Sequence, residues 1–537
     1  MCFVVIGGTE GGAAIIRVDQ KARGSQTGAS WANAYRTLQP AIDRARAGDE
    51  IWVARGTYWP TRFLIPGESD PRSRTFILKG GVSIYGGFAG NEVERSARDV
   101  ESNPTVLSGD FRRNDPTTSS GQTRTKADNA YHVAVAINQP RAPVLDGIVL
   151  RGGHANHRNY LSSRPLAGLP AGISLHKRGG GLLVVNSSLV IRNADVHSNS
   201  SGDGGGGAIF AYNTNKKKSY ALSFTDTVFS DNYTLGGEGG VLDMDSDWSS
   251  AGGILGTFKR CAFLNNQART LRIAREIEGG DGGVVNLENA TVNFGSCVFQ
   301  GNRANGGGLR DAQGAPLGIG GVVHAYKKSR VRLVNCLLTG NRSDRFGAAL
   351  GATSGPDFEV YFSTFHDNVC TATTGWGAGA IGGWYNPFKP RFDKRNSLRG
   401  LGNIFYLNET PSAVQIRWVG DNGHLRPARS ETPPAIQMDF SVIPAGSLSN
   451  NIGTILGGTP SFEGLSNPAG NDGMFFTADD GFHLSLADAV ARDQVSGGSL
   501  PNDFADLDDD GNYGEALPVD IRGSPMGLSP WNAGCYQ

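Results

Sequence analysis

Residues 282–302 read GGVVNLENATVNFGSCVFQGN, and this stretch decides the fold. It opens on a glycine pair, continues through apolar strand-like segments and ends on the Phe-x-x-Asn tetrapeptide Phe299–Asn302. Cys297 and Phe299 are two positions apart, so on a strand their side chains share one face, and the alternation around them places that face in the core. The stretch is typical of one turn of a β-solenoid.

The tetrapeptide recurs along the middle of the chain. Its asparagines are Asn199, Asn232, Asn266, Asn302, Asn341 and Asn368. The residue three positions earlier is large and apolar in each copy: Val196, Phe229, Phe263, Phe299, Leu338 and Phe365. The residue five positions earlier is small: Ala194, Thr227, Cys261, Cys297, Cys336 and Ser363. Successive asparagines are 27 to 39 residues apart, which predicts a solenoid whose insertions fall in the turns.

The other half of each repeat begins with paired small residues followed by a strand. The pairs begin at Gly206, Gly239, Gly282, Gly320, Gly347 and Gly377. Glycine suits a tight corner between sheets because it reaches positive φ and lets backbones stack closely. We therefore expect an all-β fold, a right-handed parallel β-helix solenoid with an irregular C-terminal cap.

A short helix is expected near the start of the chain. Leu38, Ile42 and Ala45 recur at helical spacing, and Gly48 follows as a stop signal. Such a helix would cover the first turn and hide an open sheet edge. The pattern then divides the chain into four parts: an N-terminal cap with the first turns (1–60), turns with long loops (61–178), regular repeats (179–410) and a closing segment with an acidic loop (411–537).

Charge and hydropathy exclude several classes of protein. The chain has 50 basic and 50 acidic side chains, so it lacks the positive field that nucleic-acid binders and polybasic membrane-surface proteins need. No apolar run reaches the length of a transmembrane helix. A secretory leader is not evident, because the apolar run at residues 3–6 is short and no basic residue precedes it.

Several motifs resemble known families. The sequences GGAI at 206–209 and FSDN at 229–232 resemble the repeats of polymorphic outer-membrane proteins. SWANAY at 30–35 and GDEIWVA at 48–54 are similar to the opening of pectin-lyase-like β-helix proteins, and residues 520–536 resemble the closing segment of choice-of-anchor proteins. The resemblance implies a β-helix and a secreted or cell-surface location. It implies no single activity, because this superfamily includes polysaccharide lyases, glycosidases, epimerases and adhesins.

The cysteines predict buried thiols. Cys261, Cys297 and Cys336 fall in one inward column, where free cysteine behaves as a small apolar residue. No CxxC-type spacing supports a metal site there. The pairing of three others is left open: Cys2, Cys370 and Cys535.

The strands after the glycine pairs carry the candidate site on their outward face. The outward positions are Phe210 and Tyr212, Asp243 and Asp245, Asn286 and Glu288, His324 and Tyr326, Gly351 and Thr353, and Gly382 and Trp384. The candidate catalytic residues are Asp243, Asp245, Glu288, His324, Tyr326 and Lys327. The candidate substrate-binding residues are Tyr212, Asn286 and Trp384. Insertions at 154–178, 213–219, 267–281 and 303–317 would wall a cleft over this face.

Three interpretations of this face stay open. It is an ordinary solvated β-surface, or it binds a glycan through aromatic rings and carboxylates, or it catalyses a reaction on one. Paired carboxylates would serve hydrolysis. His324, Tyr326 or Lys327 would instead remove the proton α to a uronate carboxylate while a bound cation stabilises the enolate.

A calcium loop is the second candidate site. Asp506, Asp508 and Asp510 alternate before Gly511 and Asn512, as oxygen ligands do at the start of a Ca²⁺ loop. The pattern departs from an EF-hand, because Leu517 stands where the closing glutamate would be. Two residues are candidates to complete the shell: Glu515 or Asp520. The alternative is an acidic solvated turn.

These observations favour a secreted or cell-surface structural or adhesive module that binds extracellular polysaccharide or surface glycan. The alternative is a polysaccharide lyase or glycoside hydrolase acting on the outward face. Calcium is the expected cofactor. Neither nucleic acid nor a transmembrane helix is expected, and self-association is left open.

Overall fold

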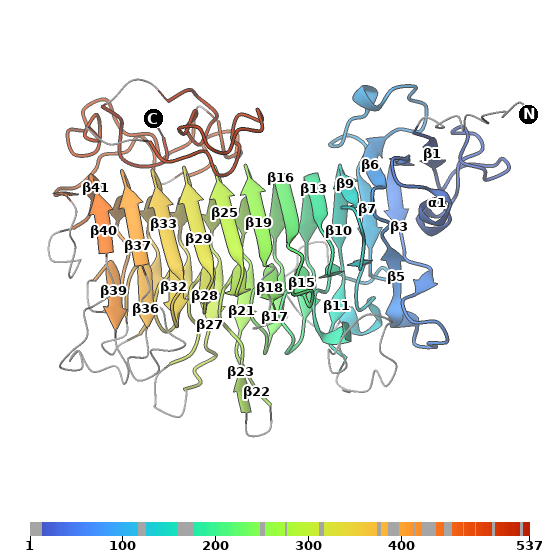
Figure 1. Cartoon of the computed structure of the whole chain (residues 1–537), viewed down its shortest axis with the longest axis horizontal. Coiled ribbons are helices and arrows are strands. Elements are labelled where there is room, and N and C mark those ends of the chain that lie inside the picture. Colours follow the sequence, from blue (N-terminus) through green and yellow to red (C-terminus); the bar gives the residue numbers. More distant parts are fainter. Residues whose placement is uncertain are drawn as a thin grey trace, which may run out of the picture.

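The chain folds as a parallel β-helix, which confirms the predicted fold class. The structure, a computed structural model, describes residues 13–115, 125–157, 175–246, 253–273, 276–310, 316–372, 377–384, 397–411, 414–419, 436–444, 454–465, 467–477, 479–496, 500–526 and 530–536. Strands stack along one axis, from the helix α1 at one end to β41 at the other (Figure 1).

One turn of the helix contributes strands to three sheets. The turn formed by residues 285–305 contains β24 (Val285–Glu288), β25 (Thr291–Gly295), β26 (Val298–Gln300) and β27 (Arg303–Asn305). Each pairs in parallel with its counterpart one turn later, β28, β29, β30 and β31. We call the sheet of β25 and β26 the long sheet, that of β24 the middle sheet and that of β27 the short sheet.

The strands described in each sheet are as follows. The long sheet contains β1 (Ile15–Val18), β2 (Glu50–Ala54), β3 (Gly56–Tyr58), β6 (Ser83–Phe88), β7 (Thr105–Ser108), β9 (Val144–Asp146), β10 (Ile148–Arg151), β13 (Leu189–His197), β16 (Tyr220–Ser230), β19 (Ile254–Lys259), β20 (Ala262–Leu264), β25, β26, β29 (Arg330–Val334), β30 (Leu337–Thr339), β33 (Asp357–Tyr361), β34 (Thr364–His366), β37 (Ser397–Leu401), β38 (Ile404–Tyr406), β40 (Ile436–Asp439), β41 (Ser441–Val442) and β42 (Ile455–Leu456). The middle sheet contains β4 (Arg62–Phe63), β5 (Arg74–Ile77), β8 (Ala134–Ile137), β12 (Leu182–Val185), β15 (Ile209–Asn213), β18 (Leu242–Ser246), β24, β28 (Val323–Tyr326), β32 (Leu350–Thr353), β36 (Ile381–Trp384) and β39 (Ile416–Val419). The short sheet contains β11 (His154–Ala155), β14 (Ser200–Ser201), β17 (Tyr233–Leu235), β21 (Gln267–Arg269), β27, β31 (Arg342–Ser343) and β35 (Val369–Cys370).

A few elements lie outside this pattern. The strands β22 (Leu271–Ile273) and β23 (Glu276–Glu278) form an antiparallel hairpin that projects from the helix (Figure 1). The helices are α1 (Leu38–Arg44) and the short 3₁₀ helices η1 (Pro71–Ser73), η2 (Arg95–Ala97), η3 (Thr125–Asp128) and η4 (Leu175–Lys177). Leu38 and Ile42 of α1 are buried and the helix contacts β1, β2 and β5, as the cap prediction requires. No helix in the described ranges is long and apolar enough to cross a bilayer.

Stacked phenylalanines fill the core under the long sheet. Ring centroids are 5.0 Å apart between Phe229 and Phe263, and 4.7 Å apart between Phe263 and Phe299. A second column runs beside the first, with Phe258 and Phe294 5.1 Å apart. All five side chains are fully buried. The inward register predicted from the tetrapeptide is therefore confirmed.

The recurring asparagines produce a buried hydrogen-bond ladder at the corner after the long sheet. Asn266 Nδ2 donates to Asn302 Oδ1 at 3.0 Å and to the carbonyl oxygen of Phe229 at 2.9 Å. The backbone N–H of Asn266 donates to the same Asn302 oxygen at 2.9 Å. Asn302 repeats these contacts with Asn341 and Phe263. Each asparagine thus satisfies polar groups of two turns that would otherwise be buried without partners.

Backbone geometry requires the first glycine of the pairs that begin at Gly206, Gly239, Gly282, Gly320 and Gly347, all of which have positive φ. Gly239 has φ +67° and Gly282 has φ +64°, in the left-handed region. A Cβ atom at Gly239 would lie 2.3 Å from the carbonyl oxygen of Leu242. No other residue can take this corner without strain.

Five cysteines are free and buried: Cys261, Cys297, Cys336, Cys370 and Cys535. Cys261, Cys297 and Cys336 stack in the inward column, where each Sγ faces backbone carbonyl oxygens. Cys2 lies outside the described residues.

The closing segment is irregular, as expected. In Figure 1 it lies beyond the arrowheads of the long-sheet strands from β19 to β41, and it packs on Val298 of β26 and Leu337 of β30. Asn293 Nδ2 donates to the carbonyl oxygen of Phe504 at 3.2 Å, and Asn335 Nδ2 donates to that of Val519 at 2.6 Å. Lys259 Nζ donates to the carbonyl oxygen of Asp506 at 2.5 Å. The outer face of the long sheet is thus covered in this region, whereas the middle sheet carries the candidate site.

Candidate functional site

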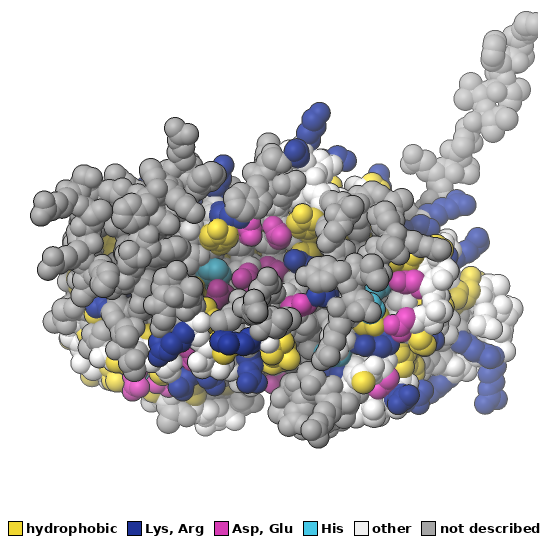
Figure 2. Space-filling view, turned by 90° about the horizontal axis from the view of Figure 1, so that it is seen from below, with side chains coloured by type: hydrophobic (Ala, Val, Ile, Leu, Met, Phe, Trp, Pro, Cys, Tyr) yellow, Lys and Arg dark blue, Asp and Glu magenta, His cyan; other side chains and the backbone are white. Residues whose placement is uncertain are grey.

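An acidic pocket of about 400 Å³ opens at the corner where the short sheet leads into the middle sheet. It is lined by Arg178, Asp203, Gly204, Gly236, Gly237, Glu238, Asp243, Asp245, Gly279, Asn286 and Glu288. Figure 2 shows acidic side chains gathered in the middle of this face of the molecule, with histidine beside them. The pocket has the size of a small-ligand site, and its lining is charged rather than apolar.

Four of the predicted site residues meet here because they occupy matching positions on neighbouring strands. Asp243 of β18 pairs with Asn286 of β24, and Asp245 pairs with Glu288. These side chains point away from the core, as the alternation predicted. They do not lie on an open surface, however, since Asp243 is only 6% exposed. The face is therefore not an exposed surface. Turns between the short sheet and the middle sheet line the pocket beside these strands, and Gly279 of the predicted insertion 267–281 belongs to one of them.

A ladder of hydrogen bonds fixes Asp243. Asn286 Nδ2 donates to Asp243 Oδ1 at 2.9 Å. Because that amide nitrogen is the donor, Asn286 Oδ1 is the acceptor for His324 Nδ1 at 2.8 Å. His324 therefore carries its proton on Nδ1, and its Nε2 accepts from Thr353 Oγ1 at 2.8 Å.

His324 is held as a neutral imidazole. Burial lowers the pKa of His324, and nearby Asp281 and Glu288 only partly oppose this effect. Both ring nitrogens are engaged, and the side chain is buried beneath the face. In this arrangement His324 positions Asn286, and through it Asp243.

Two carboxyl groups of the pocket favour the protonated form. Burial raises the pKa of Asp243 to about 7, and the charges of Asp245 and Glu288 act in the same direction, although Arg178 and the Asn286 hydrogen bond oppose them. Burial also raises the pKa of Glu238 well above its ordinary value, with further contributions from Asp281, Asp243 and Glu288. A carboxyl group protonated near neutral pH is able to act as a general acid.

Basic side chains balance only part of the acidic lining. Lys177 Nζ lies 2.7 Å from Asp203 Oδ2, and Lys327 forms an ion pair with Glu288. Arg178, the basic residue of the lining, stacks over the ring of Phe210 with its guanidinium carbon 4.6 Å from the ring centroid. The pocket as described therefore keeps a surplus of carboxyl groups.

The other predicted contacts lie beside the pocket rather than in it. Tyr212 stacks on Phe210, 6.0 Å between centroids, in a small apolar cluster. The Lys327 ammonium lies 4.6 Å from the centroid of the Tyr326 ring. The side chain of Trp384 falls outside the described residues.

The sequence interpretation missed an acidic corner position. Glu238 and Asp281 each stand directly before a glycine pair, in Glu238-Gly239-Gly240 and Asp281-Gly282-Gly283. Glu238 lines the pocket together with Asp243, and Asp281 Oδ2 lies 3.9 Å from His324 Nδ1. An acidic residue directly before the glycine pair on two successive turns could have indicated from the sequence that these residues belong to the site.

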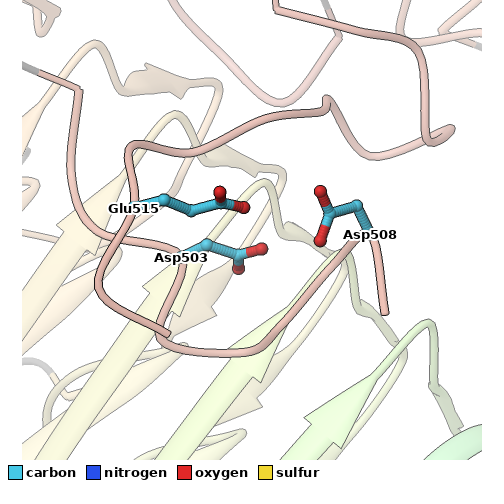
Figure 3. Close-up of side chains that lie close together, drawn as sticks. All are labelled: Asp503, Asp508 and Glu515. Atoms are coloured by element: carbon cyan, nitrogen blue, oxygen red, sulfur yellow. The ribbon is translucent and has the colours of Figure 1, made fainter. Parts of the chain in front are cut away.

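The acidic loop of the closing segment offers a second cluster of carboxylates. Asp503, Asp508 and Glu515 bring oxygen atoms within 4.8 Å of one another, and so do Asp506, Asp508 and Asp510. Figure 3 shows the first group, with its three carboxylates facing a common space. Asn512, the other predicted ligand, donates from its Nδ2 to Glu515 Oε2 at 3.3 Å.

The group around Asp503 has an unsatisfied buried oxygen. Asp503 is fully buried, and its Oδ2 accepts from the backbone N–H of Leu507 at 2.6 Å, whereas its Oδ1 has no hydrogen-bond partner among the described residues. Burial raises the pKa of Asp503, and the charges of Asp508 and Asp506 raise it further. The sequence interpretation did not include Asp503.

The comparisons with known proteins identify no family for this chain. No family model matches the chain, and no curated protein sequence is detectably similar to it. Among solved structures, the chain is similar to the crystal structure of pectate lyase Pel9A, with a TM-score of 0.48 and 12% sequence identity over 98% of this chain and 97% of that chain.

Proposed function

We propose that this chain binds a polysaccharide on the middle sheet and hydrolyses it in the acidic pocket. The observation that carries the proposal is the pair Asp243 and Asp245, two positions apart on β18, of which Asp243 is buried with a pKa raised to about 7. Glycoside hydrolysis needs one carboxylic acid to protonate the leaving oxygen and one carboxylate to act on the other face of the sugar.

The spacing of this pair favours inversion of the anomeric centre. The Cα atoms of two residues of one strand that share a face are about 6.6 Å apart, and carboxyl groups that extend in parallel from them keep about this separation. Carboxyl groups separated by roughly 6.5 to 9.5 Å leave room for a water molecule, as inverting enzymes require. We assign Asp243 as the general acid and Asp245 as the base that activates the water.

Elimination on a uronate is disfavoured by the same geometry. Both nitrogens of His324 are engaged in hydrogen bonds, and Lys327 is paired with Glu288. We therefore expect a neutral glycan, and we place the protein in the extracellular space or on the cell surface, where such polymers are met.

The experiment is incubation with a panel of neutral and uronate-containing polysaccharides, following reducing ends and unsaturated products separately. Asp243→Asn should abolish release of reducing ends from polysaccharide but keep activity on an aryl glycoside, whose phenolate leaves without a proton. Asp245→Asn should lose both activities. Asp493→Asn, an exposed position in the closing segment, is the control.

The outcomes separate the candidate functions. New reducing ends with the inverted anomer, seen by NMR, support the hydrolase. Glycan binding that Asp243→Asn weakens, with no turnover in the wild type, would identify an adhesive module instead. Unsaturated products would identify a lyase, and neither binding nor turnover across the panel would refute the proposal.

For the acidic loop we propose Ca²⁺ as the ligand. Carboxylate oxygens are the ligands that Ca²⁺ prefers, and the unpartnered Oδ1 of Asp503 supports this interpretation. Ca²⁺ should raise the melting temperature by mass action. If the group in Figure 3 is the site, Asp503→Asn should remove the increase and Asp506→Asn should keep it; the opposite result would place the ion in the Asp506 group.

A further inference from the structure

Two histidines outside the acidic pocket face each other at the N-terminal end of the middle sheet. His132 lies just before β8 and His176 lies in η4, so they come from successive turns. His132 Nε2 and His176 Nδ1 are 3.3 Å apart. Both residues are buried, at 1% and 8% exposure.

The outer nitrogen of each ring is anchored on an oxygen atom. His132 Nδ1 lies 2.9 Å from the carbonyl oxygen of Gly179. A carbonyl oxygen only accepts hydrogen bonds, so the proton of His132 sits on Nδ1 and its Nε2 offers a lone pair. His176 Nε2 lies 3.3 Å from Glu68 Oε1.

Glu68 fixes the tautomer of His176 in the same way. An ionised Glu68 accepts a hydrogen bond from His176 Nε2–H. In the neutral ring the lone pair is then on Nδ1, the atom that faces His132 Nε2.

This is the arrangement that metal-binding histidines adopt. Such histidines donate their other ring N–H to a carboxylate or a backbone carbonyl, which orients the ring and raises its basicity. Two nitrogens bound to one tetrahedral ion at about 2.0 to 2.1 Å are separated by about 3.3 to 3.4 Å. The separation in this structure is 3.3 Å.

We propose that His132 and His176 form a transition-metal site, filled by Zn²⁺ or another late first-row divalent ion, with Glu68 and the Gly179 carbonyl as supporting groups. Imidazole pairs favour these ions over Ca²⁺ and Mg²⁺, which take oxygen ligands. Water completes the shell. His157 is a third imidazole at this place, with its ring centroid 6.1 Å from that of His176.

A metal ion at this site would connect three turns of the β-helix and would fix one wall of the acidic pocket. Glu68 follows β4, His132 precedes β8 and η4 precedes β12, so an ion would cross-link segments distant in sequence. The two residues after His176 reach the pocket: Lys177 pairs with Asp203, and Arg178 lines it. Metal binding would hold this segment in place whatever reaction the pocket performs.

The test is titration of the chelator-treated full chain with Zn²⁺ by calorimetry, and with Co²⁺ by visible absorption. We expect one Zn²⁺ per chain at this site and the strong visible bands of tetrahedral Co²⁺ with nitrogen ligands. His132→Gln and His176→Gln should each remove both signals. His197→Gln, a half-buried histidine on β13, should keep them.

A further variant keeps the test informative if the histidine substitutions prevent folding. Glu68→Gln keeps both ligand rings and should weaken Zn²⁺ binding about 10- to 100-fold, as loss of a supporting carboxylate does. Zn²⁺ bound as tightly by His176→Gln as by the wild type, without the Co²⁺ bands, would place the ion at an acidic cluster and overturn the proposal. No binding in the wild type would also overturn it and would identify the pair as a proton-sharing hydrogen bond instead.

Discussion

Replacing Asp243 by asparagine should stabilise the protein at neutral and alkaline pH. The pKa of Asp243 is raised from 3.8 to about 7 by burial, so folding takes up a proton at this group. Below about pH 4 the group is protonated in both states and has no effect on stability. Between about pH 4 and pH 7 the unfolded chain has lost this proton while the folded chain keeps it, so stability falls by about 4 kcal/mol over this range, at 1.36 kcal/mol per pKa unit, and stays lower above pH 7. An asparagine side chain at this position would keep the acceptor for Asn286 and remove that charge.

The measurement is the melting temperature of wild type and Asp243→Asn between pH 4 and 9. A chain of 537 residues has an unfolding entropy of about 1.1 kcal/mol/K, so about 4 kcal/mol corresponds to roughly 3 to 4 °C. The two proteins should melt together at pH 4, and the variant should melt higher by that amount at pH 9. Asp493→Asn should follow the wild type throughout. A constant difference across the pH range would refute the raised pKa, and with it the role of Asp243 as an acid.

Three other predictions concern the core, the ladder and the reaction. Phe299→Ala should cost about 3 to 5 kcal/mol, because it removes a fully buried ring and leaves a cavity between Phe263 and Phe294, whereas Gln300→Ala on the same strand should change the denaturant midpoint little. Asn302→Ala should cost more than one hydrogen bond, at about 1 to 3 kcal/mol for each buried group left unpaired, and urea unfolding would measure it. The kcat/KM of glycan hydrolysis should fall above about pH 7 as Asp243 loses its proton, and a flat profile through pH 9 would exclude Asp243 as the acid.

The fold could be predicted because its rules are local. A single turn requires a large apolar residue three positions before its asparagine and a glycine at its corner. Because the turns stack in register, the same requirements recur in each turn and become visible as a sequence repeat. The hydrogen-bond ladder could not be predicted, because it depends on the asparagine of the next turn lying directly above. The position of the closing segment could not be predicted either, because its contacts with the long sheet join residues far apart in the sequence, such as Lys259 and Asp506.

The candidate site was predicted in part for the same reason. Strand alternation placed Asp243, Asp245 and Glu288 on one outward face, and the register brings Asp245 beside Glu288. The burial of these side chains comes from turns whose lengths follow no repeat, and those turns also supply Asp203 and Glu238. The solvated-face interpretation does not fit the burial of Asp243.

A solenoid turns a short sequence motif into a site by stacking, and its turns decide whether that site is enclosed. Each turn offers few outward side chains, so a pocket with several carboxyl groups must draw on two or three turns and on the corners before them. Burying carboxyl groups beside one another destabilises their ionised forms, as the raised pKa values of Asp243 and Glu238 indicate. The segment 176–178 is where that cost can be offset, because Lys177 and Arg178 bring positive charge to the pocket while His176 would anchor the segment to a metal ion. If this reasoning holds, removing the ion should loosen the Lys177–Asp203 pair and raise KM for the glycan. It should also raise the pH at which Asp243 titrates, because the charge of Arg178, which lowers the pKa of Asp243, would be held less firmly.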